Sequence, residues 1–550
     1  MKEQLTVVEY VIERLAALGI EHIFGVAGDY AFPIEDAACK SDNLQWIGNC
    51  NELNASYAAD GYARVKGMAA LSTTFGVGEL SAINGVAGAY TENLTVFHLV
   101  GMPASHVQQS SRLVHHTLGD GNFLLFYELG QRLACAHAIL TPENCVDEME
   151  RLIHVAMKEH RPVYIGLPSD YAESALIFPD EERVITPDIS DPASHDEAIA
   201  AIVGKLTESK SVCVLPGIIT SRLGLTRDVK TLISTTGFPF ATMFMDKSVI
   251  EESDPHYIGM YNGNLMNTDV KQFVENCDCV LMIGATLTDF NTGCFTSALE
   301  RKKIISIDSH QVTVDDKTFH NIAMKDVLQA LISILPHAEI ATPKPGSLGK
   351  PVSNAEGKIT PQYLYPRFEH FFRKNDIIFA ETGTVSMGLG FALLPEGAQL
   401  HNQTLWGSIG WATPAAFGAG MALPDRRTLL ITGEGAHQLT AQEISQFGRF
   451  GLKPIIFVIN NDGYLIERLL CKDPEAIYND LPQWSYAQLP KVLGCNDWFC
   501  RKVSTCDELD EAMREAESCN QASYIEIVME RYAASELAEK LGASVATLYS

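Results

Sequence analysis

The chain has 550 residues, of which 46% are apolar and 20% charged, the composition of a soluble globular protein with several domains. The 41 Lys and Arg against 68 Asp and Glu give a net charge of −27, which argues against nucleic acid or an anionic membrane as a partner. Its 13 scattered cysteines form no CxxC pair, and no signal-peptide core or membrane-length apolar run is present, so we expect a cytoplasmic protein with reduced thiols.

Two proline-rich stretches with few apolar residues, 179–193 and 336–357, predict linkers. They predict domains at residues 1–180, 190–340 and 356–550, each of ordinary size. Each part alternates strand-like runs with amphipathic helical stretches, which favours an α/β fold with parallel sheets. A helical stripe is formed by Val8, Ile12, Leu15 and Leu18. The predicted strands are residues 22–26, 44–47, 163–165, 212–215, 280–283, 304–307, 377–380, 428–431 and 455–459.

Three short motifs lie in the first predicted domain. Asn51 and Glu52 open a predicted helix, where an acid is also favoured simply by the helix dipole. Asp29 ends a glycine turn and is either a helix cap or a functional acid. His115 and His116 stand side by side in a loop-like segment, and neighbouring residues of a helix or strand face different directions, so the two need not share one ligand. A histidine can donate a proton near neutral pH.

The most informative stretch lies in the third predicted domain. Gly433-Glu434-Gly435 follows one predicted strand, and Asn460-Asn461-Asp462-Gly463 follows the next. Between them Thr440, Ile444 and Phe447 recur at helical spacing, which completes a β-α-β unit whose two strand ends meet at one sheet edge. Carboxylate and carbonyl oxygens suit Mg²⁺, which usually completes its shell with phosphate. Each motif alone is a common turn, but together they predict a metal-bound diphosphate.

Together these motifs resemble those of thiamine-diphosphate enzymes, whose signature is usually Gly-Asp-Gly followed by Asn-Asn. Glu434 stands where the family normally has Asp, so the ion or the turn must accommodate one more methylene. The pair His115-His116, followed by Thr-Leu, is similar to that of the pyruvate and indolepyruvate decarboxylases. The resemblance covers essentially the whole chain. It implies three doubly wound α/β domains: a pyrimidine-binding domain, a middle structural or regulatory domain, and a diphosphate- and Mg²⁺-binding domain with a C-terminal lid helix.

The resemblance also implies roles for individual residues. Glu52 would share a proton with the cofactor's pyrimidine and so promote ylide formation, and the histidines would supply the proton that the enamine takes up after CO₂ loss. The implied catalytic residues are Glu52, Asp29, His115, His116 and Glu467. The implied cofactor-binding residues are Glu52, Thr384, Gly407, Ser408, Ile409, Glu434, Gly435, Ala436, Asn461 and Gly463, with Glu434, Asn461 and Gly463 as metal ligands. For Glu467 the alternative is a solvated acid paired with Arg468, and for residues 405–411 it is core packing.

The implied activity is non-oxidative decarboxylation of a 2-oxo acid, pyruvate or a larger branched or aromatic one, to an aldehyde and CO₂. The implied substrate pocket is lined by Phe290, Ser386, Met387, Ile466, Leu470 and Leu541, with Ser386 small where the tightest pyruvate enzymes carry a bulky aromatic. The family's cofactor bridges two subunits, which implies a homo-oligomer: at least a dimer, with a tetramer (a dimer of dimers) as the expected assembly. Two alternatives are a carboligase of the acetolactate-synthase type and a catalytically weak relative that binds cofactor only.

Overall fold

A computed structural model describes residues 5–179 and 190–548, with side chains described as far as residue 545. The first predicted linker, 179–193, therefore lies mostly outside the described residues. Contacts group the chain into two compact units. The first unit contains the described part of residues 1–186 together with Gly410–Asp425 and Thr440–Leu452, and the second contains the rest. Each unit is described on its own below, and the predicted domain bounds stay predictions.

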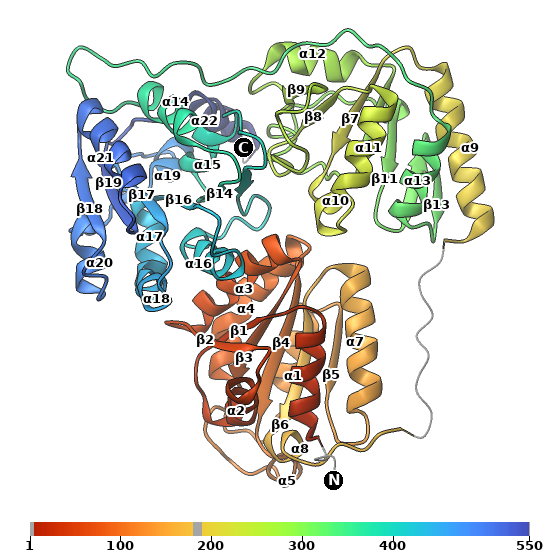
Figure 1. Cartoon of the computed structure of the whole chain (residues 1–550), viewed down its shortest axis with the longest axis vertical. Coiled ribbons are helices and arrows are strands. Elements are labelled where there is room, and N and C mark those ends of the chain that lie inside the picture. Colours follow the sequence, from red (N-terminus) through yellow and green to blue (C-terminus); the bar gives the residue numbers. More distant parts are fainter. Residues whose placement is uncertain (1–4, 180–189, 549–550) are drawn as a thin grey trace. The chain divides into compact units, whose positions relative to one another are not determined.

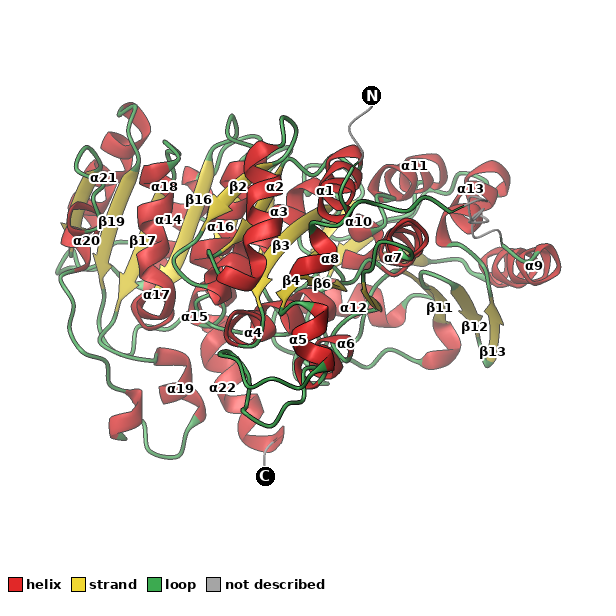
Figure 2. Cartoon of the chain, turned by 90° about the horizontal axis from the view of Figure 1, so that it is seen from below, coloured by secondary structure: helices red, strands yellow, loops and turns green. Residues whose placement is uncertain are grey.

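The first unit is built on a six-stranded sheet of order β2-β1-β3-β4-β6-β5, in which all neighbours are parallel (Figure 1). The strands are β1 His22–Gly25, β2 Gln45–Gly48, β3 Met68–Thr74, β4 Thr95–Met102, β5 Ala136–Ile139 and β6 Val163–Pro168. The helices are α1 Val7–Ala17, α2 Phe32–Lys40, α3 Glu52–Lys66, α4 Val77–Thr91, α5 Ser105–Gln109, α6 Leu125–Gln131, α7 Cys145–Glu159 and α8 Ser169–Ala172. One core joins α1, α2, α7 and α8 to the sheet, and it contains the predicted stripe residues Val8, Ile12 and Leu15. Figure 2 shows these helices and the strands.

Two further helices of the first unit come from late in the chain, α16 Ala412–Ala422 and α18 Ile444–Arg449. α16 packs against α3 so closely that the helices meet at glycine. A Cβ added at Gly61 would lie 2.0 Å from the carbonyl oxygen of Ala415, and one added at Gly418 would lie 1.9 Å from that of Ala58. Small side chains at this crossing therefore fix the seating of α3, the helix that begins with Glu52.

The second unit holds two sheets. One has the order β13-β12-β11-β10-β7-β8-β9 and the strands β7 Val212–Pro216, β8 Phe240–Thr242, β9 Tyr257–Met260, β10 Cys279–Ile283, β11 Ile304–Ile307, β12 Gln311–Val314 and β13 Lys317–His320. Its helices are α9 Pro192–Glu208, α10 Ile218–Arg222, α11 Thr226–Thr236, α12 Thr268–Asn276 and α13 Met324–Ile334. The pairs β11–β12 and β12–β13 are antiparallel, an exception at this edge to the predicted parallel sheet. The connecting turns are too short for a parallel crossover, and Asp315 takes the positive φ of 53° that a tight hairpin requires.

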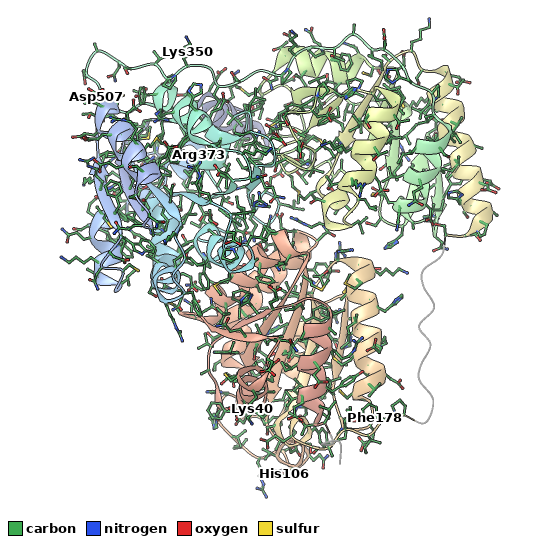
Figure 3. The ribbon with its side chains drawn as sticks, viewed as in Figure 1. Lys40, His106, Phe178, Lys350, Arg373 and Asp507 are labelled. Carbon is green, nitrogen blue, oxygen red and sulfur yellow. The ribbon has the colours of Figure 1, made fainter. Side chains whose placement is uncertain are left out.

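The other sheet of the second unit is parallel throughout, in the order β15-β14-β16-β17-β19-β18. Its strands are β14 Ile377–Ala380, β15 Gln399–His401, β16 Thr428–Gly433, β17 Ile455–Asn460, β18 Phe499–Val503 and β19 Ser523–Val528. Its helices are α14 Pro361–Phe371, α15 Thr384–Leu389, α17 Glu434–Thr440, α19 Leu465–Leu470, α20 Leu489–Val492, α21 Cys506–Ser518 and α22 Glu536–Leu548. The predicted linker at 336–357 contains neither helix nor strand, and Lys350 within it is exposed (Figure 3). In the described part of the chain no helix is long and apolar enough to cross a membrane.

The single helix predicted between β16 and β17 is wrong in one respect. Thr440, Ile444 and Phe447 are all buried as expected, but a 3-10 turn at Ala441–Glu443 separates α17 from α18. The Thr440 hydroxyl donates a hydrogen bond of 2.7 Å to the Gly410 carbonyl, and Thr440 leaves helical geometry with φ −138° and ψ 14°. A tertiary contact thus breaks the helix at a position where its own sequence favours continuation.

The α3–α16 crossing yields a stability prediction. Gly61→Ala forces a Cβ onto the Ala415 backbone, so we expect destabilisation of about 1–3 kcal/mol, seen as a lower melting temperature. Gly204→Ala in α9 is the matched control, because its Cβ would meet open space and alanine favours a helix interior by about 0.5–1 kcal/mol. Equal melting temperatures for Gly61→Ala and the unchanged protein would contradict the close packing.

Candidate active site

In the second unit, the predicted metal ligands lie together at the carboxyl edge of the parallel sheet that contains β16 and β17. β16 and β17 are parallel neighbours, so the turns that follow them meet. The Glu434 side chain is 2% exposed, and its Oε1 accepts the backbone N–H groups of Asn461 at 3.1 Å and Gly463 at 2.9 Å. Gly463 has φ 139°, a conformation that glycine adopts readily.

The chemistry of this cluster fits a divalent cation. The Asn461 side-chain amide faces the cluster and can place its nitrogen 3.2 Å from Glu434 Oε1 and 3.2 Å from the Gly463 carbonyl oxygen, donating to both. With a cation among these oxygens, the amide would present its own oxygen instead. Burial raises the pKa of the Glu434 carboxyl to about 7, although the N–H donors of Gly463 and Asn461 lower it. Carboxylate, amide and carbonyl oxygens are the donors that Mg²⁺ prefers, so these three residues fit Mg²⁺.

The other predicted cofactor residues of this unit occupy neighbouring turns. Thr384 is the first residue of α15, and Ala436 is buried in the first turn of α17. Gly407 has φ 66°, and its N–H donates to the Gln403 carbonyl at 3.1 Å. The Gln403 side chain accepts the Ser408 N–H at 2.9 Å. Gln403 thus fixes the turn that carries Gly407, Ser408 and Ile409, and its place in the sequence gave no sign of that role.

In the first unit, Asp29 and the two histidines form one cluster. Asp29 Oδ2 lies 2.6 Å from His115 Nε2, and Asp29 Oδ1 lies 3.9 Å from His116 Nδ1. The sequence left open whether the neighbouring imidazoles share a partner. In the structure both lie near Asp29, and His116 takes φ 61° in an irregular loop. The Tyr30 ring, which the sequence did not single out, stacks on His115 at 4.9 Å between centroids.

Asp29 does not cap a helix. It is the first residue of a short 3-10 helix whose N-cap is Gly28, and no side-chain cap hydrogen bond is formed. The cap interpretation is therefore wrong, and the Asp29 carboxylate instead pairs with the imidazoles.

Glu52 is the first residue of α3, and the Asn51 side chain caps the helix by accepting the Asn54 N–H at 2.8 Å. Burial raises the pKa of the Glu52 carboxyl above its ordinary value. Its Oε1 lies beside the first turn of α4, 3.3 Å from where a Cβ on Gly78 would stand. Glu52 is therefore a partly desolvated acid whose protonated form is favoured more than that of a free carboxyl group.

Glu467 lies exposed on α19, and its proposed pairing with Arg468 is wrong. Arg468 is buried and binds Asp480 Oδ1 at 2.9 Å and the Asp462 carbonyl at 3.0 Å. Arg468 thus fastens the turn after β17 to the loop around residue 480, and the Glu467 carboxylate faces solvent.

Five of the six predicted pocket residues share one hydrophobic cluster in the second unit. Met387 and Leu541 are buried in it, and Phe290, Ile466 and Leu470 pack against it. Ser386 is adjacent, and its hydroxyl donates to the Gly383 carbonyl at 3.0 Å. Phe244, which sequence reasoning missed, belongs to the same cluster with its ring 6.0 Å from that of Phe290. Phe244 lies in the middle of the chain and belongs to no motif, so the sequence alone did not indicate that it would join this cluster.

Comparison with known proteins identifies the family. Residues 5–122 match the N-terminal TPP binding domain of thiamine pyrophosphate enzymes, residues 199–333 the central domain, and residues 380–527 the C-terminal TPP binding domain. The chain belongs to the thiamine pyrophosphate (thiamine diphosphate) enzyme family. The predicted family, the three-part α/β fold class and the cofactor pair of thiamine diphosphate and Mg²⁺ are confirmed.

Relatives narrow the group within this family. The chain is 37% identical to pyruvate decarboxylase isozyme 3 of Saccharomyces cerevisiae, over 94% of this chain and 93% of that protein. It is 37% identical to an alpha-keto-acid decarboxylase of Mycobacterium leprae over 95% and 93%, and 38% identical to a putative pyruvate decarboxylase of Schizosaccharomyces pombe over 96% of each. The roles of individual site residues stay predictions.

The metal turn yields a pH-dependent prediction. A proton and Mg²⁺ compete for the Glu434 carboxylate, whose pKa without metal is about 7, so Mg²⁺-dependent cofactor binding should weaken about tenfold from pH 8 to pH 6. Glu434→Asp keeps the charge and should retain or tighten metal binding, whereas Glu434→Gln should weaken it by at least about tenfold. Calorimetric titration of the cofactor-free protein measures both. Abolished binding in Glu434→Asp would show that the carboxylate does not act as a ligand in this way.

Proposed function

We propose that this protein decarboxylates 2-oxo acids with apolar side chains, pyruvate included, to the corresponding aldehydes. The observation that carries the proposal is the Asp29–His115–His116 cluster, in which a carboxylate 2.6 Å from an imidazole nitrogen can hold and deliver one proton. The relatives are named pyruvate decarboxylase and alpha-keto-acid decarboxylase, which agrees with that chemistry.

Several residues would hold the cofactor. Glu434, Asn461 and the Gly463 carbonyl would bind Mg²⁺, and the backbone of Thr384, Gly435 and Ala436 would lie against the diphosphate. The 407–409 turn would support the pyrimidine, with Ile409 as the side chain that keeps the two rings of the cofactor close. When bound, thiamine diphosphate supplies the carbon nucleophile and the electron sink that decarboxylation of a 2-oxo acid requires.

The chain's own acids and bases move the protons. Glu52, with its pKa raised by burial, would exchange a proton with the pyrimidine nitrogen. His115 and His116 would hold, against Asp29, the proton that the product carbon takes up after CO₂ leaves. Glu467, exposed on α19, would face the substrate.

The pocket cluster supports a broad substrate range. Ser386 is small and turns its hydroxyl back to Gly383, so no aromatic ring stands at position 386, next in the chain to Met387 of this cluster. A hydrophobic pocket discriminates weakly between side chains that differ by one methylene, at about 1–3 kcal/mol. We therefore include branched and aromatic 2-oxo acids among the substrates.

We also propose a homo-oligomer, at least a dimer. α4 is apolar on nearly every face, yet Val77 is 51% and Leu80 39% exposed, and Leu129 on α6 nearby is 41% exposed. A helix that is apolar all round is ordinarily covered, and a second copy of the chain would cover this one. The assembly of two such dimers into a tetramer and a cytoplasmic location, which the 13 free cysteines favour, belong to the same proposal.

A substrate panel tests the activity. With thiamine diphosphate and Mg²⁺, CO₂ and aldehyde should be released from pyruvate and from branched, phenyl and indole 2-oxo acids, and Ser386→Trp should reduce kcat/KM for the aromatic acids by at least about tenfold relative to pyruvate. Ser386→Ala is the control and should keep the range. Release of no CO₂ from any acid would favour a cofactor-binding relative, and ligated products without free aldehyde would favour a carboligase.

Glu52 has a separate test. Glu52→Gln cannot exchange a proton, so the proton on the reacting carbon of bound cofactor should exchange with solvent at least about a hundredfold more slowly. Quenched-flow NMR measures this exchange without any substrate. Glu35→Gln is the control, because Glu35 is also a half-buried acid of the first unit but bonds the Gly28 N–H. An unchanged exchange rate in Glu52→Gln would remove Glu52 from the mechanism.

A further inference from the structure

We infer that Glu443 is a positioning residue for Glu52: it clamps the turn Asn49–Asn54, from which the Glu52 carboxyl projects. The inference deepens the proposed function, since it rests on the role of Glu52 as the proton-exchanging acid. All the residues involved belong to the first unit, although Glu443 comes from the stretch that follows the Glu434 turn.

The contacts form a closed set around one carboxylate. Glu443 is fully buried. Its Oε1 accepts the side-chain amide of Asn49 at 2.7 Å. Its Oε2 accepts the side-chain amide of Asn54 at 2.8 Å and faces the Cys50 backbone N–H at 3.4 Å. The donors thus come from both sides of Glu52, three residues before it and two residues after it.

The other side of the turn is also fixed. Asn49 donates its backbone N–H to the Gly25 carbonyl at 2.8 Å, and its side-chain oxygen accepts the Gly25 N–H at 3.2 Å. The Asn49 amide therefore cannot turn over without losing a bond to the end of β1, and its nitrogen must face Glu443. The Asn49–Asn54 turn is held between the sheet edge and Glu443, which leaves Glu52 little freedom to shift.

The chemistry requires a carboxylate at position 443. Both of its oxygens face N–H donors, which an amide could satisfy at only one atom. In the described residues its hydrogen-bond partners are neutral, and burial raises the pKa of Glu443 even though the Asn49 and Asn54 amides lower it. A buried acid without a cation costs stability. A role in positioning Glu52 would account for this cost, because a proton-exchanging acid must be placed with a precision of a fraction of an ångström relative to its reaction partner.

The 3-10 turn at Ala441–Glu443 explains how Glu443 reaches the turn. It interrupts the helix after Thr440 and begins α18 at Ile444. The neighbouring Gln442 carbonyl accepts the Cys50 thiol at 3.3 Å, a second contact between the same two segments. The break in the helix and the placing of Glu443 against residues 49–54 are therefore one feature.

Glu443→Gln tests the inference with two measurements that do not depend on turnover. In the cofactor-free protein, amide hydrogen exchange of the peptide 49–54 should rise at least about fivefold, because the clamp is weakened locally. With cofactor and Mg²⁺ bound, exchange of the cofactor's reacting proton should slow about tenfold, while cofactor affinity changes less than about threefold. Glu275→Gln is the matched control. Glu275 accepts hydrogen bonds from the Tyr261 hydroxyl and the Ala298 N–H in the second unit, so its replacement should alter neither measurement.

A second variant tests the inference in case Glu443→Gln does not fold. Asn54→Ala removes one donor and leaves Glu443 in place, and it should shift both measurements in the same direction by a smaller factor. Wild-type hydrogen exchange at 49–54 together with wild-type proton exchange on the cofactor, in whichever variant folds, would overturn the inference. Failure of the wild type to release CO₂ from any 2-oxo acid would overturn the proposed function instead, and slowed proton exchange in Glu443→Gln would still support the positioning role.

Discussion

A buried carboxylate must find N–H donors or a cation, and this constraint organises one turn in each of the two units. Glu434 is met by the backbone N–H groups of the turn after β17, and Glu443 by the amides and backbone of the turn before α3. Both acceptors belong to the segment that joins β16 to β17. In each case the acid holds a turn at the carboxyl edge of a parallel sheet, where strand ends leave backbone groups available.

The sequence predicted the elements whose own residues carry the pattern, such as apolar runs that form buried strands. Residues 377–380 form a strand with the expected bounds, because this strand is fully buried and parallel to both neighbours, and such strands are continuous apolar runs. The break between α17 and α18 could not be predicted in this way. Thr440, Ile444 and Phe447 have helical spacing, and only the hydrogen bond from Thr440 to Gly410, which is distant in the chain, ends the helix. The sequence did not predict the antiparallel edge of the seven-stranded sheet, because this edge depends on the short turns after β11 and β12.

The candidate site divides in the same manner. Glu434, Asn461 and Gly463 could be named because motif and function lie in one stretch, and His115 and His116 because an adjacent pair is conspicuous. Glu443 and Gln403 act through hydrogen-bond partners that no motif identifies. Glu443, for example, accepts a hydrogen bond from Asn49, which lies 394 positions away in the chain. Residues that position others have no composition or spacing of their own, so only the three-dimensional structure can reveal them.

The acids of the site also bias the direction of the proposed reaction. A 2-oxo acid arrives as an anion, and the chain as a whole carries a charge of −27. Asp29 lies against two imidazoles, and a proton shared within that cluster would lower the repulsion toward an incoming carboxylate. Once CO₂ has left, the reacting group no longer carries that negative charge, and the same carboxylates no longer oppose it. If these acids line the substrate site as proposed, they would disfavour the substrate's carboxylate more than the product, which would promote decarboxylation over retention of the acid.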